Sequence, residues 1–131
     1  MANNAIENIK TEEGFKGTVY KDTKGFDTLG YGTKMPITED EAELILIHRF
    51  RIMQKELDIA LKNKVETRVL NILDEMAYQL GVPKLLTFKK MIKALENKDY
   101  LEASKEMIDS EWHKETPARC ERLSERVKKI N

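Results

Sequence analysis

Two carboxylate side chains near the amino terminus have the types and spacing that acid–base chemistry requires. Glu13 stands at the end of a short helical pattern, and Asp22 follows nine positions later in a segment typical of a turn, Asp22-Thr23-Lys24-Gly25. A sheet folded back beside that helix would set the two carboxyls across a cleft. Hydrolysis of a glycosidic bond needs such a pair, because one carboxylic acid protonates the leaving oxygen while the other carboxylate activates water or attacks the sugar. The spacing alone also fits ordinary surface charges.

Other kinds of site have weaker signatures. The segment Gly30-Tyr31-Gly32-Thr33 contains a glycine pair, but no helical pattern starts directly after it and no Lys-Ser or Lys-Thr completes a phosphate loop. His48 and His113 are far apart in the chain and outside any metal-ligand spacing. No local signature surrounds a serine or cysteine nucleophile. The paired carboxylates remain as the candidate chemistry.

The composition narrows the choice of partner and compartment. The 131 residues include 23 basic and 23 acidic side chains, so no net field directs the molecule toward nucleic acid or a membrane. Cys120 is the single cysteine, which excludes an intrachain disulfide and favours a reducing compartment. The amino terminus lacks a signal-peptide pattern, and the longest aliphatic run, residues 44–47, is too short to span a bilayer. We expect a cytosolic protein with no stable membrane contact.

The elements that must position the carboxylates form an α+β pattern. A first helix is expected to end near Glu13, because Gly14 is a stop signal. Strand-forming residues over 17–34 predict an antiparallel hairpin or a three-stranded sheet. Thr38 with Glu41 forms a capping box that opens a helix of about 24 residues.

The rest of the chain is expected to be helical. One apolar stripe ends at Gly81, a second runs over residues 85–95, a third helix is capped by Asp99, and a last helix starts at Thr116-Pro117. We therefore predict one α+β domain with a small antiparallel sheet lobe over residues 13–36, a linking helix over 38–62, and a helical lobe over 66–131 that includes the first helix.

Five stretches of the chain resemble one known family. They are EEG, VYKDTKGFDTLGYG and ITEDEAE in the first half, and AYQLG and SEWHKETPARCER in the second. In this order they resemble the phage-type lysozymes, the endolysins of glycoside hydrolase family 24, the family of the T-even phage lysozyme. The matches cover roughly residues 6–43 and 70–122. The resemblance implies the lysozyme fold, no metal, and no organic cofactor.

The same resemblance assigns roles to three residues of the first block. Glu13 would be the general acid that protonates the bridging oxygen. Asp22, with the hydroxyl of Thr28, would hold and activate a water on the opposite face of the sugar. This is an inverting hydrolysis, for which the two carboxyls are expected to lie about 6.5–9.5 Å apart.

Further residues are implied by the matching motifs. Arg119 matches the arginine that the family places against the catalytic glutamate, and the sugar cleft would be lined by Gly30, Tyr78 and Gln79. Trp112 is expected in the core of the helical lobe. The sequence departs from the family's best-known member at Thr33, where that enzyme has a histidine, and in a much shorter segment after it, which predicts a smaller sheet lobe and a more open cleft.

These features predict a muramidase that hydrolyses the β-1,4 bond between N-acetylmuramic acid and N-acetylglucosamine in bacterial peptidoglycan. The enzyme is expected to wait as a monomer in the host cytoplasm until a holin releases it to the wall. Three alternatives stay open: a lytic transglycosylase, a non-catalytic wall-binding module with the lysozyme fold, and a purely regulatory helical protein. Asp22 and Thr28 disfavour the transglycosylase, which needs no activated water.

Overall fold

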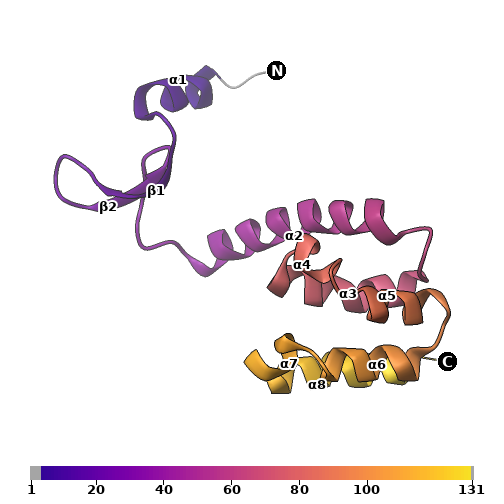
Figure 1. The fold of residues 1–131 in the computed structure, drawn as a ribbon. Coiled ribbons are helices and arrows are strands. Elements are labelled where there is room, and N and C mark those ends of the chain that lie inside the picture. Colours follow the sequence, from indigo (N-terminus) through magenta and orange to yellow (C-terminus); the bar gives the residue numbers. More distant parts are fainter. Residues whose placement is uncertain (1–3, 131) are drawn as a thin grey trace. The chain divides into compact units, whose positions relative to one another are not determined.

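A computed structural model describes residues 4–130 and confirms the α+β class. Figure 1 shows a small sheet near the amino terminus followed by helices. The elements are, in chain order, α1 (Asn4–Glu13), β1 (Lys16–Lys21), β2 (Asp27–Gly30), β3 (Thr33–Lys34), α2 (Glu39–Leu61), α3 (Thr67–Leu80), α4 (Val82–Leu85), α5 (Lys89–Glu96), α6 (Tyr100–Ile108), α7 (Glu111–Glu115) and α8 (Pro117–Lys128). None of the helices within residues 4–130 has the length and apolar character needed to cross a bilayer.

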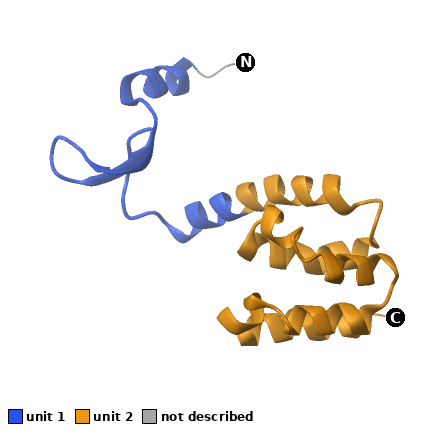
Figure 2. Ribbon diagram, viewed as in Figure 1, with its two compact units in different colours: residues 1–46 blue, residues 47–131 orange. Residues whose placement is uncertain are grey.

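The chain divides into two compact units, residues 1–46 and residues 47–131 (Figure 2). The first contains α1, the sheet and the start of α2, and the second contains the remaining helices. The grouping of α1 with the helical lobe, expected from the sequence, stays a prediction.

Two local features shape the first unit: the end of α1 at Gly14 and the tight turn between β1 and β2. Gly14 has φ +69°, and its N–H donates to the carbonyl of Lys10 at 2.9 Å, so α1 ends directly after Glu13 as predicted. β1, β2 and β3 form a three-stranded antiparallel sheet in that order. The N–H of Gly25 closes the β1–β2 turn by donating to the carbonyl of Asp22 at 3.0 Å.

The capping box at the start of α2 is present. The Glu41 carboxylate accepts from the N–H of Thr38 at 2.9 Å, and the Thr38 hydroxyl accepts from the N–H of Glu41 at 3.2 Å. The backbone N–H of Thr38, with a smaller effect of its hydroxyl, favours the ionised form of the Glu41 carboxylate and lowers its pKa. The helix then runs for 23 residues and ends at Leu61, close to the predicted end.

The second unit contains the hydrophobic core. Among the described residues, every buried apolar side chain belongs to this unit, from Leu57 onward. The helix that was expected to stop at Gly81 does so, but the stripe over 85–95 is divided between α4 and α5. The Thr87 hydroxyl donates to the carbonyl of Lys84 at 2.6 Å, and the N–H of Phe88 donates to that of Leu85 at 3.0 Å. These bonds form a turn where the apolar pattern alone suggested a continuous helix.

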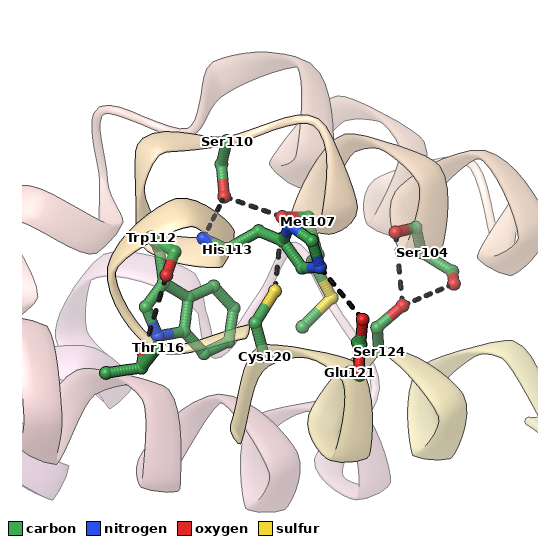
Figure 3. A network of polar contacts seen from close by, with 9 residues as sticks. All are labelled: Ser104, Met107, Ser110, Trp112, His113, Thr116, Cys120, Glu121 and Ser124. Atoms are coloured by element: carbon green, nitrogen blue, oxygen red, sulfur yellow. Dashed lines mark hydrogen bonds and ion pairs between the residues drawn. The ribbon is translucent and has the colours of Figure 1, made fainter. Parts of the chain in front are cut away.

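Polar contacts join the last three helices (Figure 3). The Ser110 hydroxyl caps α7, a short helix that the sequence patterns did not reveal, by accepting from the N–H of His113 at 3.3 Å. Trp112 is fully buried, as expected. Cys120 is also buried, its thiol donates to the carbonyl of Met107 at 3.2 Å, and burial raises the pKa of this thiol to about 11. The thiol therefore stays protonated and packs as a small core group.

Candidate active site

Glu13 ends α1 with an exposed side chain whose carboxyl reaches the β2–β3 turn. A Cβ placed on Gly32 would lie 2.6 Å from Oε2 and 2.7 Å from Cδ of Glu13. Gly32 also has φ +74°, a conformation that side-chain-bearing residues rarely adopt. Because residue 32 is a glycine, no side chain prevents the Glu13 carboxyl from lying against the backbone of the turn.

Asp22 follows β1 and is held by three donors. Its Oδ1 accepts from the backbone N–H groups of Lys24 at 2.9 Å and Phe26 at 2.8 Å. Its Oδ2 accepts from the Lys34 ammonium in a short ion pair. The side chain is 15% exposed. The Lys34 contact and the backbone donors favour the carboxylate, so the pKa of Asp22 lies below its usual range.

Thr28 is the one buried residue within residues 4–46, with 1% of its surface exposed. Its hydroxyl donates to the carbonyl of Phe26 at 2.9 Å, and that carbonyl also accepts from the N–H of Asp22 at 2.9 Å. Thr28 and Asp22 thus both donate a hydrogen bond to the same carbonyl group. Because the hydroxyl proton of Thr28 is already donated, its oxygen is left to accept a hydrogen bond from a further partner.

The strand register brings the polar groups to one face of the sheet. Tyr20 pairs with Thr28, and Thr28 pairs with Lys34, so these three residues form a row across the strands. Asp22 lies directly after β1, and its ion pair with Lys34 places its carboxylate on the face of this row. Thr33 pairs with Leu29 and therefore belongs to the opposite face. The position that departs from the family's best-known member is thus on the face opposite Thr28 and Lys34.

One residue of this site was missed from the sequence. Gly30 and Gly32 indicated a bend or a surface that another group approaches closely, and Gly32 is the glycine that the Glu13 carboxyl contacts; a role of Gly30, at the end of β2, in lining the cleft stays a prediction. Lys34 was not singled out because nothing local connects it to Asp22, twelve positions earlier. The available signal was the spacing of Thr28 and Lys34 around a tight turn, which makes them cross-strand partners.

The remaining predicted site residues belong to the second unit. Tyr78 is exposed on α3, and its ring centroid lies 6.5 Å from that of Phe50. The Gln79 amide accepts from the Trp112 indole N–H at 3.0 Å and donates to the Thr116 hydroxyl at 3.1 Å, so it joins α3 to the α7–α8 junction.

Arg119 is exposed in the first turn of α8, between the anchored residues Thr116 and Cys120. Glu13, Asp22 and Thr28 thus all belong to the first unit, where Asp22 and Thr28 share the Phe26 carbonyl and Glu13 lies against Gly32. A contact of Arg119 with Glu13 stays a prediction.

Comparisons with known proteins point to one family. The model of a family described as phage lysozyme matches residues 10–129. Probable T4-type lysozymes 1 and 2 of Dictyostelium discoideum are 29% and 27% identical to the chain, and each match covers 94% of this chain and 92% of the relative. The pre-baseplate central spike protein Gp5 of Enterobacteria phage T4 is 26% identical over 90% of this chain and 26% of its own length. The chain therefore belongs to the phage lysozyme family, and this membership supports a lysozyme-like glycosidase function.

Proposed function

We propose that the chain is a muramidase that hydrolyses the β-1,4 bond between N-acetylmuramic acid and N-acetylglucosamine in bacterial peptidoglycan. One observation carries the proposal. A helix-terminal carboxyl, Glu13, lies against Gly32 of the same small sheet on which Asp22 and Thr28 share a peptide group. Two carboxyls in different surroundings, with a hydroxyl beside one of them, are the groups that acid–base cleavage of a glycoside needs.

In the proposed reaction Glu13 begins protonated and gives its proton to the bridging oxygen as the bond from that oxygen to the sugar carbon breaks. A water on the opposite face of the sugar forms the new carbon–oxygen bond and gives its proton to Asp22. The lowered pKa of Asp22 suits this role, because a base must be ionised while the acid still holds its proton. Thr28, whose oxygen can only accept, orients the second hydrogen of the water.

Other parts of the proposal rest on the family resemblance. Arg119 is proposed to orient Glu13, and Gly30, Tyr78 and Gln79 are proposed to contact the glycan strand. Gln79 already uses its carbonyl oxygen and one N–H inside the protein, which leaves one N–H for a ligand. Host lysis after holin-dependent release from the cytoplasm, and action as a monomer, belong to the same proposal.

Product analysis tests the reaction. Purified peptidoglycan is digested, and the released fragments are examined by mass spectrometry and by proton NMR immediately after cleavage. Hydrolysis gives a reducing muramic acid end, and inversion gives the α-anomer first. A 1,6-anhydro end, lighter by one water, would assign a lytic transglycosylase instead. Binding to the wall without any new ends would assign a non-catalytic module.

A further inference from the structure

We propose that Lys34 is a positioning residue that fixes one oxygen of Asp22 and thereby defines the single place at which that carboxylate can receive the attacking water. The inference rests on the proposed function and adds a residue that the sequence motifs do not include. It is carried by the ion pair of Lys34 with Asp22, by the strand register, and by the donors that occupy the rest of the carboxylate.

The acceptor positions of Asp22 can be counted. A carboxylate has two oxygens with two lone-pair directions each. Both directions at Oδ1 are taken by the N–H groups of Lys24 and Phe26, and one direction at Oδ2 is taken by the Lys34 ammonium. One direction at Oδ2 remains. Without Lys34, Oδ2 would offer two equivalent positions, and the carboxylate would no longer select one of them.

The strand register brings Lys34, which holds Oδ2 of Asp22, beside Thr28 on one face of the sheet. Thr28 and Lys34 are directly opposite each other on β2 and β3, so their side chains are neighbours on the sheet. The hydroxyl proton of Thr28 is donated to the carbonyl of Phe26. A water that gives one hydrogen to Oδ2 of Asp22 and the other to the Thr28 hydroxyl keeps its oxygen lone pairs for the sugar carbon.

Electrostatics support the same role. The Asp22 contact is the main reason that the pKa of Lys34 is raised, and the charge of Glu13 and the nearby Tyr20 add to it. Lys34 therefore stays cationic through neutral pH, in contact with the proposed base Asp22 and within the electrostatic range of the proposed acid Glu13. The groups that act on the Asp22–Lys34 pair are Glu13 at the end of α1 and Tyr20 on β1.

The same sheet provides a matched comparison. Lys21 on β1 forms an ion pair with Asp27 on β2 at 2.6 Å, and by alternation this pair is on the opposite face from Asp22. The Asp27 side chain is 49% exposed, so this is an ordinary surface ion pair of small energetic value. Lys21 and Lys34 are thus two lysines paired to aspartates in one sheet, of which only Lys34 contacts the proposed base.

The experiment compares Lys34→Met, Lys34→Arg and Lys21→Met with the parent on purified peptidoglycan, with the folded state of each verified by circular dichroism. Lys34→Met is expected to lower kcat about tenfold with KM within about twofold, because the water is misplaced while substrate contacts remain. The acid limb of its kcat/KM profile is expected to move to higher pH, since Asp22 loses its main stabilising partner. Lys34→Arg should retain most of the activity, and Lys21→Met all of it.

The outcomes separate the two proposals. If the parent releases no new ends from peptidoglycan, the proposed function fails. If the parent is active and Lys34→Met matches Lys21→Met in kcat and in the acid limb, the role of Lys34 fails alone. If Lys34→Met does not fold, Lys34→Arg is the deciding variant. The proposal then requires that Lys34→Arg keep both kcat and the acid limb of the pH profile near the parent values.

Discussion

Each of the two units of this protein is stabilised internally by a different kind of interaction. In the second unit, residues such as Leu73, Met76 and Trp112 are completely buried, and apolar packing supplies the main stabilising term. In the first unit Thr28 is the one buried residue among residues 4–46, and the large apolar side chains of that range are mostly exposed. Its geometry comes instead from a glycine turn, strand register, and hydrogen bonds to Asp22.

This difference indicates that stability and chemistry are separable along the chain. The candidate acid and base are in the first unit, which has little buried core to hold their carboxyls in place. The second unit, with its buried core, supplies most of the folding free energy. It also carries the exposed residues Tyr78 and Arg119. Substitutions in the second unit should therefore affect unfolding first, and substitutions around Gly32 should affect activity first.

The largest expected effect on stability is a difference between truncating a buried leucine of the second unit and truncating an exposed leucine of the first. Leu73→Ala removes a side chain with no exposed surface and is expected to lower the free energy of unfolding by about 3 kcal/mol, from lost burial plus a cavity. Leu44→Ala, on α2 in the first unit, removes a side chain that is 68% exposed and should change it by less than about 0.5 kcal/mol. Urea denaturation measures both, and equal losses would contradict the contrast between the units.

A smaller effect is expected on activity, when alanine replaces a glycine beside Glu13 or a glycine of the second unit. Gly32→Ala would place its Cβ 2.6 Å from the Glu13 carboxyl oxygen, so it should lower wall hydrolysis by about tenfold or more as that carboxyl is displaced. Gly81→Ala has similar backbone strain at φ +87° but only ordinary contacts, and it should cost about 1–3 kcal/mol of stability without changing kcat. Activity and thermal unfolding are measured on both variants. Loss of kcat in Gly81→Ala, or its retention in Gly32→Ala, would refute the assignment.

The features predicted correctly from sequence are local ones. The end of α1 at Glu13 follows from Gly14 in the next position, and the start of α2 follows from the Thr38–Glu41 box. The stop at Gly81 is of the same kind. Each depends on residues within a few positions, for which spacing and propensity are sufficient information.

The features that were missed depend on distant partners. Lys34 meets Asp22 only because β3 folds back on β2, and Gly32 meets Glu13 only because the turn lies against the end of α1. The position of Thr33, where the sequence departs from the family's best-known member, also depends on strand pairing, because the register places Thr33 on the face away from Thr28. The break between α4 and α5 depends on hydrogen bonds of Thr87 that an apolar stripe does not encode.

Clearing of purified peptidoglycan sacculi shows whether the carboxyl groups of Glu13 and Asp22 in the first unit perform the chemistry. Turbidity is followed for the parent, Glu13→Gln and Asp22→Asn at equal concentrations of folded protein. Both variants are expected to keep the fold, because neither residue belongs to the core, and to clear sacculi at least about a hundredfold more slowly. Clearing by either variant at the parent rate would show that the substituted carboxyl is not needed for hydrolysis.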